Sequence, residues 1–484
     1  MRSQNIFILF FFIAIILILS TVYFINDEKS PAPNYVEISP DNTSYFQLSD
    51  GSPYIPIGIN MINPNYPIND PDSALLEVET WMKNLSENGG NYVRIWLSQS
   101  FWDMEEEKAG VYDSVKIKRI DRFIDLARKY GLRIKMTFEH FRGITEEEMP
   151  RSWIRKSVYH TSEGGPLDSV RQYLTSEAGF KLFLDKLDFY QNRYGSDTLF
   201  FGWELWNEMN AMRVPKDSIF FAWNEMMLSE TKKRFPENLV MQSLGSFDRE
   251  SVRETYRKMM KLPGNEVAQI HRYLDLGADM EICHAPMDVI TSSAIEELLS
   301  YNLDKPAILA ETGGVEPRHT GPIRYYELDS AGILLHDVLF APFFSGSAGA
   351  GMNWHWNAYV HPNNLWYHFG RFASAVQGIN PIQGKFVPSK TETESFRIYV
   401  LKGAATILIW LRDKNNTWKS ELEEGIPPQI IQDRTIGLNT LNINQPVSNI
   451  RIYDPWKNEW SESKIEDARI LLPDFIRSLV VRME

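Results

Sequence analysis

Apolar, strand-like segments alternate with helix-like segments along most of the chain, and this alternation constrains the fold more than any other feature. Eight short apolar segments are predicted to be strands, at residues 55–60, 92–97, 133–140, 199–210, 239–244, 266–271, 306–311 and 351–356. Segments with apolar residues at helical spacing lie between or after several of them, at residues 74–87, 117–130, 176–194, 217–235 and 365–376. Such alternation indicates parallel βαβ units, and eight units close a barrel. We therefore predict an α/β protein with a (β/α)8 TIM barrel at residues 34–383.

The last hundred residues have a different pattern. Helical periodicity disappears, and short β-branched or alternating runs follow at residues 395–401, 404–410, 447–453 and 477–482, separated by Asn, Gly and Pro. Short runs of this kind between turn residues are typical of antiparallel strands. We predict a small C-terminal antiparallel β-sandwich domain at residues 384–484.

The amino terminus carries a candidate export segment. Residues 6–25 are an almost unbroken apolar run behind Arg2, and about twenty such residues are long enough to cross a bilayer. A polar, proline-containing stretch follows at residues 26–33. We predict that residues 1–33 are a signal peptide or an N-terminal membrane anchor with a tether, and whether the segment is cleaved stays open. The protein is then extracytoplasmic, either secreted or anchored, and contacts a membrane only through this segment.

Charge and cysteine content exclude several partners and cofactors. A net charge of −13 argues against a nucleic-acid partner, because phosphate backbones require clustered basic residues. The only cysteine, Cys283, excludes an intrachain disulfide and a cysteine-based zinc cluster, and is predicted to be a buried structural thiol. The glutamates at 146–148 are predicted to be a solvated helix start. The remaining histidines lack the short spacing of zinc ligands, so we predict no metal and no cofactor.

Polar and aromatic side chains gather at the predicted carboxyl ends of the strands, which in a barrel form the active-site rim. They are Arg94, His140, Asn207, Glu208, His271, Tyr273, Glu311, Trp354 and Trp356. Two carboxylates, Glu208 after the fourth strand and Glu311 at the end of the seventh, would converge across the mouth of the barrel. A pair of this kind, with one acid to protonate a leaving oxygen and one carboxylate to attack or to activate water, is typical of glycosidases.

These residues resemble the pattern of the glycoside hydrolase clan that includes the cellulases and mannanases of family 5. Asn207-Glu208 is similar to the clan's Asn-Glu pair on strand four, Glu311 to its strand-seven glutamate, and Arg94 to its strand-two arginine. His140, the His271-Arg272-Tyr273 run and one of the two strand-eight tryptophans resemble further members, in the same order along residues 40–380. Two features depart from the family pattern: His140 follows Phe138-Glu139, and the strand-eight segment carries two tryptophans and a histidine.

The resemblance implies a role for each residue. Glu208 would be the general acid and then the general base, and Glu311 the nucleophile, with carboxyl groups about 5–5.5 Å apart as in retaining enzymes. Arg94 and Tyr273 would lower the pKa of Glu311 while burial raises that of Glu208. Asn207 would bind the sugar 2-hydroxyl and His140 and His271 would orient hydroxyls or Glu208. Trp354 or Trp356 would stack on the sugar.

We therefore predict a retaining glycoside hydrolase that cleaves β-glycosidic bonds in oligo- or polysaccharides, with a carbohydrate substrate as its partner. The sugar and its linkage stay open, as do endo or exo action and glycan binding by the C-terminal domain, because these depend on loop conformation. An exo-acting β-glycosidase on short oligosaccharides and a non-catalytic carbohydrate-binding protein on a barrel scaffold are the alternatives. Arg94, His140 and His271 could also be structural residues of the core.

Overall fold

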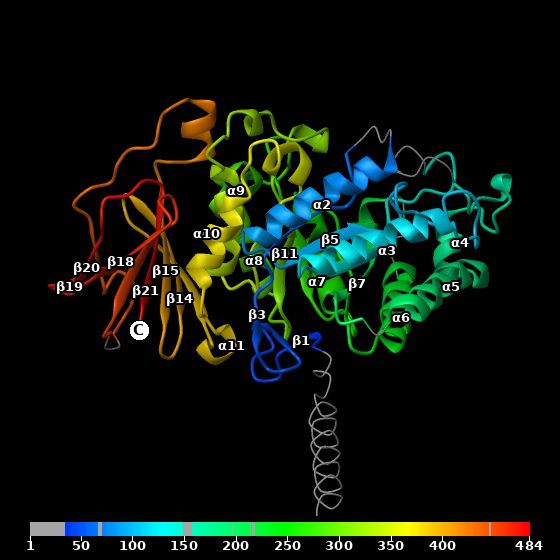
Figure 1. Cartoon of the computed structure of the whole chain (residues 1–484), viewed down its shortest axis with the longest axis horizontal. Coiled ribbons are helices and arrows are strands. Elements are labelled where there is room, and N and C mark those ends of the chain that lie inside the picture. The colour runs from blue at the N-terminus through cyan, green and yellow to red at the C-terminus, as the bar shows by residue number, and fades with distance from the viewer. Residues whose placement is uncertain are drawn as a thin grey trace, which may run out of the picture. The chain divides into compact units, whose positions relative to one another are not determined.

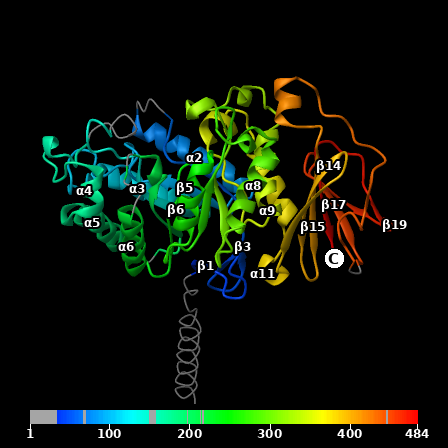
Figure 2. The same cartoon turned by 180° about the vertical axis from the view of Figure 1, so that it is seen from behind.

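A ring of parallel strands surrounded by helices forms the larger part of the computed structural model, and antiparallel sheets form the rest (Figures 1 and 2). The structure describes residues 34–65, 70–148, 157–195, 197–212, 214, 218–444 and 447–484. The predicted export segment at residues 6–25 lies outside this part of the chain. None of the helices in the described part is both long and apolar enough to cross a membrane.

Seven of the eight predicted strands are present, and all but β6 (Arg133–His140) are shorter than predicted. They are β4 (Gly58–Asn60), β5 (Tyr92–Trp96), β6 (Arg133–His140), β7 (Phe200–Asn207), β8 (Leu239–Met241), β9 (Ala268–His271) and β11 (Ala307–Glu311). The first five form one parallel sheet in chain order, and β9 pairs in parallel with β11. Nearly every residue of these strands is buried, because the barrel interior covers one face and helices the other. The predicted barrel is therefore confirmed.

The eighth strand position departs from the prediction. Residues 351–356 form no continuous ladder, and Asn353 instead makes single parallel bridges to Ile59 and Thr312. The side chain of Asn353 accepts a hydrogen bond from the His355 backbone N–H at 2.8 Å, which turns the chain away from an extended path. A π-helix, η8 (Trp356–Val360), follows immediately. The segment still closes the barrel between β11 and β4, but with a bend at the rim.

Helices cover the outside of the barrel. They are α2 (Pro71–Glu87), α3 (Ser114–Lys129), α4 (Val170–Thr175), α5 (Glu177–Tyr194), α6 (Ser218–Arg234), α7 (Arg253–Met260), α8 (Met287–Leu299), α9 (Ile333–Phe344) and α10 (Tyr367–Val376). Sequence periodicity does not predict α4, α7, α8 or α9. Helix α9 explains why: all of its twelve residues are buried, so it has no polar face to give a helical period.

A small antiparallel sheet covers the opposite, amino-terminal end of the barrel. It consists of β1 (Val36–Ile38), β2 (Phe46–Leu48) and β3 (Pro53–Tyr54). Phe46 packs edge-to-face against Phe201 of β7, with ring centroids 5.0 Å apart. Because this sheet covers the amino-terminal end, the accessible mouth of the barrel lies at the carboxyl ends of the strands.

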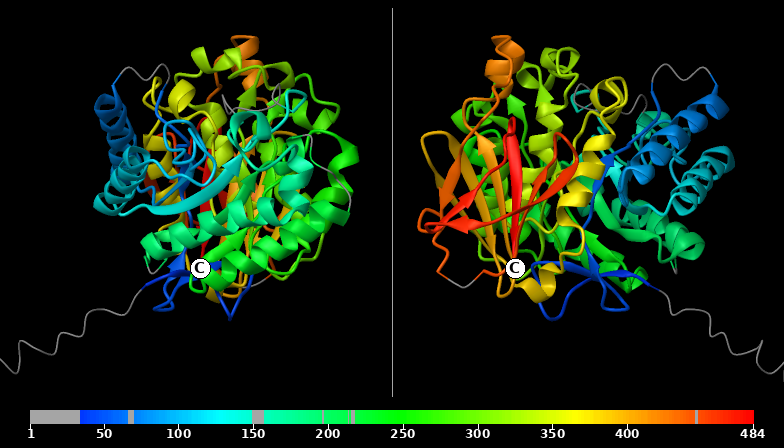
Figure 3. Two further views of the ribbon diagram at one scale, coloured as in Figure 1. Left: turned by 90° about the vertical axis from the view of Figure 1, so that its right-hand side faces the viewer. Right: turned by 60° about the vertical axis from the view of Figure 1, so that its left-hand side comes forward.

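The C-terminal region contains two antiparallel sheets (Figure 3). The larger has the order β13 (Val387–Glu392), β14 (Phe396–Lys402), β15 (Ile407–Asp413), β21 (Ser478–Met483), β17 (Ile450–Asp454), β18 (Glu459–Ser463). The smaller has the order β16 (Thr435–Gly437), β20 (Arg469–Leu471), β19 (Ile465–Glu466). Ile409 belongs to an apolar cluster that both sheets share, whereas Trp410, on the other face of β15, stacks on Phe340 of α9 at 5.8 Å. The larger sheet is thus apolar on both faces.

Residues Tyr35–Glu484 form one compact unit. The contact between β15 and α9 joins the C-terminal sheets to the barrel, and buried ion pairs reinforce it: Arg412 on β15 donates to Asp337 of α9 at 2.8 Å. The predicted domain boundary between residues 383 and 384 therefore stays a prediction.

Candidate active site

The two predicted catalytic carboxylates lie at the carboxyl ends of β7 and β11. Glu208 follows β7 with a left-handed backbone, φ 48° and ψ 41°, which is costly for a residue with a side chain. Its N–H donates to Ser243 Oγ at 3.3 Å. Glu311 is the last residue of β11. Backbone strain of this kind clusters at functional sites, where the surrounding structure holds it in place.

Glu208 and Glu311 face each other across a cavity. One carboxylate oxygen of each lies within 4.8 Å of the other, and of a ring nitrogen of His271. The cavity has a volume of about 840 Å³, and Tyr273, Trp354 and both glutamates line it. This separation is close to that of retaining glycosidases, whose carboxyl groups lie about 5–5.5 Å apart.

Two donors hold Glu311. Tyr273 donates its hydroxyl proton to Glu311 Oε2 at 2.9 Å, and Arg94 Nη1 donates to Glu311 Oε1. Arg94 also donates from Nη2 to Asn207 Oδ1 at 2.6 Å, so it links the strand-four and strand-seven residues. These contacts hold the Glu311 carboxylate in one orientation across the cavity.

A third carboxylate, Glu204, lies beneath Arg94 and was missed by the sequence analysis. Arg94 donates to Glu204 Oε2 from Nε at 2.9 Å and from Nη2 at 2.6 Å, and Thr137 donates to the same oxygen at 2.7 Å. Lys135 Nζ lies 3.6 Å from this oxygen. All four side chains are fully buried. A signal was available: charged residues in the middle of buried strands require partners, and both Lys135 and Glu204 occupy such positions.

The two predicted histidines lie behind the cavity wall. His271 Nδ1 and Glu208 Oε1 share a hydrogen bond of 2.6 Å, while His140 Nδ1 and Ser98 Oγ are also 2.6 Å apart. Burial lowers the pKa of His271 well below its usual value and that of His140 to about 3. Both rings are therefore neutral at neutral pH and act as hydrogen-bonding groups. His271 contacts Glu208 directly, and neither histidine lines the cavity.

Burial and charge shift the pKa values of the two glutamates. Burial, with the nearby Glu311 charge, raises the pKa of Glu208 well above its usual value. Burial also raises the pKa of Glu311, although Arg94 and Tyr273 act to lower it. Arg94 and Tyr273 thus act on the Glu311 pKa in the expected direction, but the desolvation of a fully buried carboxylate outweighs them and the net direction is upward. Glu311 nevertheless keeps the donors that stabilise its charge.

The structure separates the two tryptophans of the strand-eight segment. Trp354 lines the cavity, and its ring centroid lies 4.9 Å from that of Trp96. Trp356 is 3 % exposed and belongs to the main apolar core. The bend at Asn353 and the start of η8 explain the difference, since a regular strand would put both on one face. Trp96 and Phe141, which the sequence analysis did not select, complete an aromatic wall on this side.

Two other sequence predictions have different outcomes. Cys283 is buried, as predicted, and burial raises its pKa to about 11. Glu148 was predicted to be solvated, but it is 8 % exposed and accepts backbone hydrogen bonds from Ile144 and Thr145, both at 2.9 Å. The prediction of a solvated side chain is therefore wrong for Glu148.

Comparisons with known proteins bear on the fold and on the class of enzyme. No model of a known protein family matches the chain. Mannan endo-1,4-beta-mannosidase 5 of Solanum lycopersicum is 25 % identical over 296 residues, covering 56 % of this chain and 70 % of the relative. Mannan endo-1,4-beta-mannosidase 3 of the same plant is 26 % identical over 297 residues, covering 56 % and 71 %.

Solved structures resemble this fold over 70 % to 93 % of the chain. A glycoside hydrolase family 5 protein from Bacteroides vulgatus matches with a TM-score of 0.59 and 12 % identity over 93 % of each chain. An exo-beta-1,4-mannosidase from an Opitutaceae bacterium matches with a TM-score of 0.51 and 15 % identity, covering 70 % of this chain and 62 % of the other. The predicted resemblance to glycoside hydrolases of family 5 is therefore confirmed, and the relatives agree with the predicted class of enzyme.

Proposed function

We propose that this protein is a retaining glycoside hydrolase that cleaves β-linked mannose-containing oligo- or polysaccharides. One observation carries the proposal: carboxylate oxygens of Glu208 and Glu311 lie within 4.8 Å of each other in a cavity of about 840 Å³. Their surroundings differ, since Glu311 accepts hydrogen bonds from Arg94 and Tyr273 whereas Glu208 meets the neutral His271. Two carboxyl groups in unlike environments can divide the acid and nucleophile roles.

In the first step Glu311 attacks the anomeric carbon and the bond to the leaving oxygen breaks. Glu208 is protonated because its pKa is raised, and it gives this proton to the leaving oxygen. The leaving sugar therefore departs as a neutral alcohol. The product is a glycosyl ester of Glu311. Arg94 and Tyr273 stabilise the carboxylate before attack and fix the oxygen that attacks.

In the second step water enters the place of the leaving sugar. Glu208, now ionised, takes one proton from the water, and the resulting oxygen attacks the anomeric carbon as the ester bond to Glu311 breaks. Glu208 regains its proton and Glu311 its negative charge, so the site returns to its starting state. Two inversions at one carbon give net retention of configuration.

Three further groups have surroundings that suit contacts with a substrate. Trp354 offers an aromatic face in the cavity, which suits stacking on a sugar ring. Within the described residues, Asn207 Nδ2 and His271 Nε2 are buried donors or acceptors without a hydrogen-bond partner. Asn207 precedes Glu208 in the chain and His271 hydrogen-bonds to it, so both residues lie beside the acid and suit the hydroxyl groups of a bound sugar.

We choose mannose because the relatives described above are named as mannosidases. The experiment is hydrolysis of β-1,4-mannan, manno-oligosaccharides, cello-oligosaccharides and aryl β-glycosides by residues 34–484, beside Glu208→Gln and Glu311→Gln. We expect activity on mannose-containing substrates, reduced at least about a hundredfold by each substitution. The size of the released products decides between endo and exo action.

The matched control is Glu281→Gln, which makes the same change at a side chain that is 97 % exposed. It should retain full activity. Wild-type activity in either cavity variant would contradict the assignment of Glu208 and Glu311 as catalytic residues. Hydrolysis of cello-oligosaccharides alone would contradict the proposal of a mannose-containing substrate. Binding without hydrolysis on every substrate would favour the non-catalytic alternative.

We also propose that residues 6–25 direct the chain out of the cytoplasm, on the strength of their apolar length alone. Cell fractionation tests this, since deletion of residues 1–33 should leave the protein in the cytoplasm. The two C-terminal sheets are proposed to form a small β-sandwich domain, because they share one apolar cluster.

A further inference from the structure

A loop that follows the nucleophile forms one wall of the catalytic cavity. We call residues 316–328 the rim loop; it follows β11 and the short strand β12 (Gly314–Val315). His319 to Pro322 line the cavity together with Glu208 and Glu311. The rim loop therefore forms part of the wall of the cavity that would receive the substrate.

The tip of the rim loop is strained. Arg318 and His319 have φ values of 64° and 57°, and two consecutive left-handed residues other than glycine are unfavourable. Such a conformation persists only where the surrounding structure holds it. His319 packs edge-on against Tyr273 with ring centroids 5.1 Å apart, and its Nε2 lies 3.6 Å from Asp275 Oδ2. These contacts hold the tip, but the loop also needs a fixed base.

The base is a single turn, η7 (Arg324–Glu327), in which two consecutive tyrosines have different partners. The Tyr326 hydroxyl accepts a hydrogen bond from the Gly314 N–H at 2.6 Å and lies 3.2 Å from His355 Nδ1. Tyr326 therefore connects the base to the segment just after Glu311. The Tyr325 hydroxyl donates instead to Glu423 Oε1 at 2.5 Å, in the C-terminal region.

Glu423 belongs to a short π-helix, η9 (Lys419–Glu423), that leaves the C-terminal sheets and packs on the barrel loops. Trp418, immediately before it, is 4 % exposed; its ring lies 5.4 Å from that of Tyr325, and its Nε1 donates to Ala285 O at 2.9 Å. We call Trp418 and η9 the brace. Figures 1 and 2 both draw the brace, in orange, beside the loops above the barrel.

The C-terminal sheet holds the brace from behind. Arg477 Nε donates to Glu421 Oε2 at 3.0 Å, and Asn416 joins this oxygen to Arg412 of β15 through hydrogen bonds of 2.5 Å and 3.3 Å. Arg412 and Asn416 are both buried. A continuous set of contacts thus runs from the sheet through the brace and Tyr325 to the wall of the cavity.

We propose that the brace positions the rim loop over the catalytic cavity, so that the C-terminal region sets the affinity for substrate without taking part in the chemistry. Trp418 and Glu423 are then positioning residues that act through Tyr325. This inference rests on the proposed function for its activity measurement, but its structural part can be tested without activity.

The kinetic test uses Trp418→Ala, Glu423→Ala and Tyr325→Phe. Each substitution removes a contact between the brace and the base of the rim loop. KM should rise about tenfold while kcat changes less than about twofold, because the lost contact stabilises the bound substrate and the transition state equally. Trp418→Phe keeps a ring against Tyr325 and should recover most of the affinity. The double variant Tyr325→Phe with Glu423→Ala should equal either single variant, because both remove one hydrogen bond.

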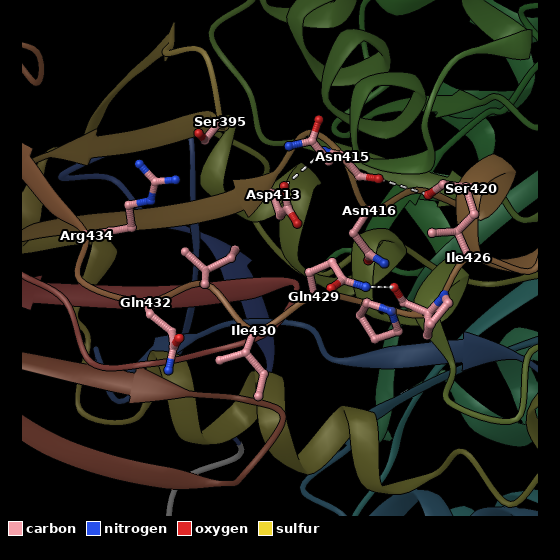
Figure 4. A pocket seen from close by; sticks show the side chains of 13 residues that line it. Ser395, Asp413, Asn415, Asn416, Ser420, Ile426, Gln429, Ile430, Gln432 and Arg434 are labelled. Carbon is pink, nitrogen blue, oxygen red and sulfur yellow. Dashed lines mark hydrogen bonds between the residues drawn. The ribbon is translucent and has the colours of Figure 1, made fainter.

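The matched control lies in the same C-terminal segment, a few residues after the brace. Gln429 is exposed and lines a separate cavity of about 430 Å³, where its side chain donates to Pro427 O at 3.0 Å (Figure 4). Gln429→Ala should leave KM unchanged. A rise in KM equal to that of the brace variants would show that the effect is not specific to the rim loop and would overturn the proposal.

A second measurement is independent of catalysis. Arg318 is exposed at the strained tip, so trypsin cleavage after it reports how firmly the rim loop is held. Both proteins that are compared carry Glu311→Gln. Cleavage should be faster when either Trp418→Ala or Glu423→Ala is added, and the unfolding temperature should stay within a few degrees in Glu423→Ala, because Glu423 is exposed. Equal cleavage rates, or variants that lose kcat and stability together, would overturn the proposal. If wild type hydrolyses nothing but the cleavage rates differ, the proposed function fails and the brace stands.

Discussion

At the scale of single residues, the site depends on the ion pairs among four buried side chains, which are Arg94, Lys135, Glu204 and Glu311. Arg94 lies between Glu204 and Glu311 and contacts both, while Lys135 approaches Glu204 from below. Burial alone would lower the pKa of Arg94, but the two carboxylates raise it above its usual value. Burial likewise lowers the pKa of Lys135, to about 7. Glu204 therefore decides how much of the Arg94 charge acts on Glu311.

Glu204→Gln tests this sharing. Glu204 raises the pKa values of both Glu208 and Glu311, so its neutralisation should move both limbs of the pH profile of kcat/KM to lower pH. It should also cost about 3–5 kcal/mol of stability, because Arg94 and Lys135 lose a buried counterion. Thr137→Val removes a hydrogen bond to the same carboxylate without changing the charge, and should leave both limbs in place. Unmoved limbs in a folded Glu204→Gln protein would refute the account.

The pH profile of the wild type follows from the same groups. The free enzyme needs Glu311 ionised and Glu208 protonated, and the pKa values of both are raised. Activity should fall on the acid side above the ordinary glutamate pKa of about 4.3, and on the basic side as Glu208 loses its proton. Measured kcat/KM against pH should give a bell, and the basic limb should disappear in Glu208→Gln. A basic limb that persists in that variant would assign it to another group.

At the scale of elements, the sequence predicts the strands and their rim residues well, because apolar runs that end in polar residues are a local signal. Arg94, Asn207, Glu208, Tyr273 and Glu311 all come together at one mouth. The strand-eight segment could not be predicted, since its bend comes from a side-chain hydrogen bond within the turn at Asn353. Nor could α9, whose surroundings are supplied by a sheet distant in sequence.

The bend at the eighth strand gives two neighbouring tryptophans different roles. Trp354→Ala removes a ring from the cavity wall, so KM should rise about ten- to a hundredfold, equivalent to ~1.4–2.8 kcal/mol, with little change in stability. Trp356→Ala empties a buried core position and should cost about 3–5 kcal/mol of stability. Steady-state kinetics and denaturant unfolding of both variants separate the two effects. The reverse assignment of affinity and stability would contradict the placement of the rings.

At the scale of the whole molecule, the C-terminal sheets complete the core of the barrel. Trp410 stacks on Phe340, and Arg412 pairs with Asp337 where both are buried. The sequence predicts a second domain, packed on the barrel, because the pattern of periodicity changes near residue 384, but it carries no signal for how much surface the two domains share. The brace is a further consequence of this shared surface.

A chain that ends at residue 383 tests this dependence. It would expose α9, in which all twelve residues are buried in the full chain, and would leave Asp337 without Arg412. We expect the truncated protein to be insoluble or to unfold well below the full chain, as measured by soluble yield and thermal unfolding. A soluble truncation with full activity and unchanged stability would show that the barrel is independent of the C-terminal sheets.

The central claim is that Glu208 and Glu311 act together in a double displacement. The most direct test is the anomeric configuration of the first product, followed by proton NMR during hydrolysis of a β-mannoside before mutarotation mixes the forms. The account predicts that the β configuration is released first, because a glycosyl ester of Glu311 forms and is then hydrolysed. Release of the α form first would mean a single displacement by water, and would contradict the role of Glu311 as nucleophile.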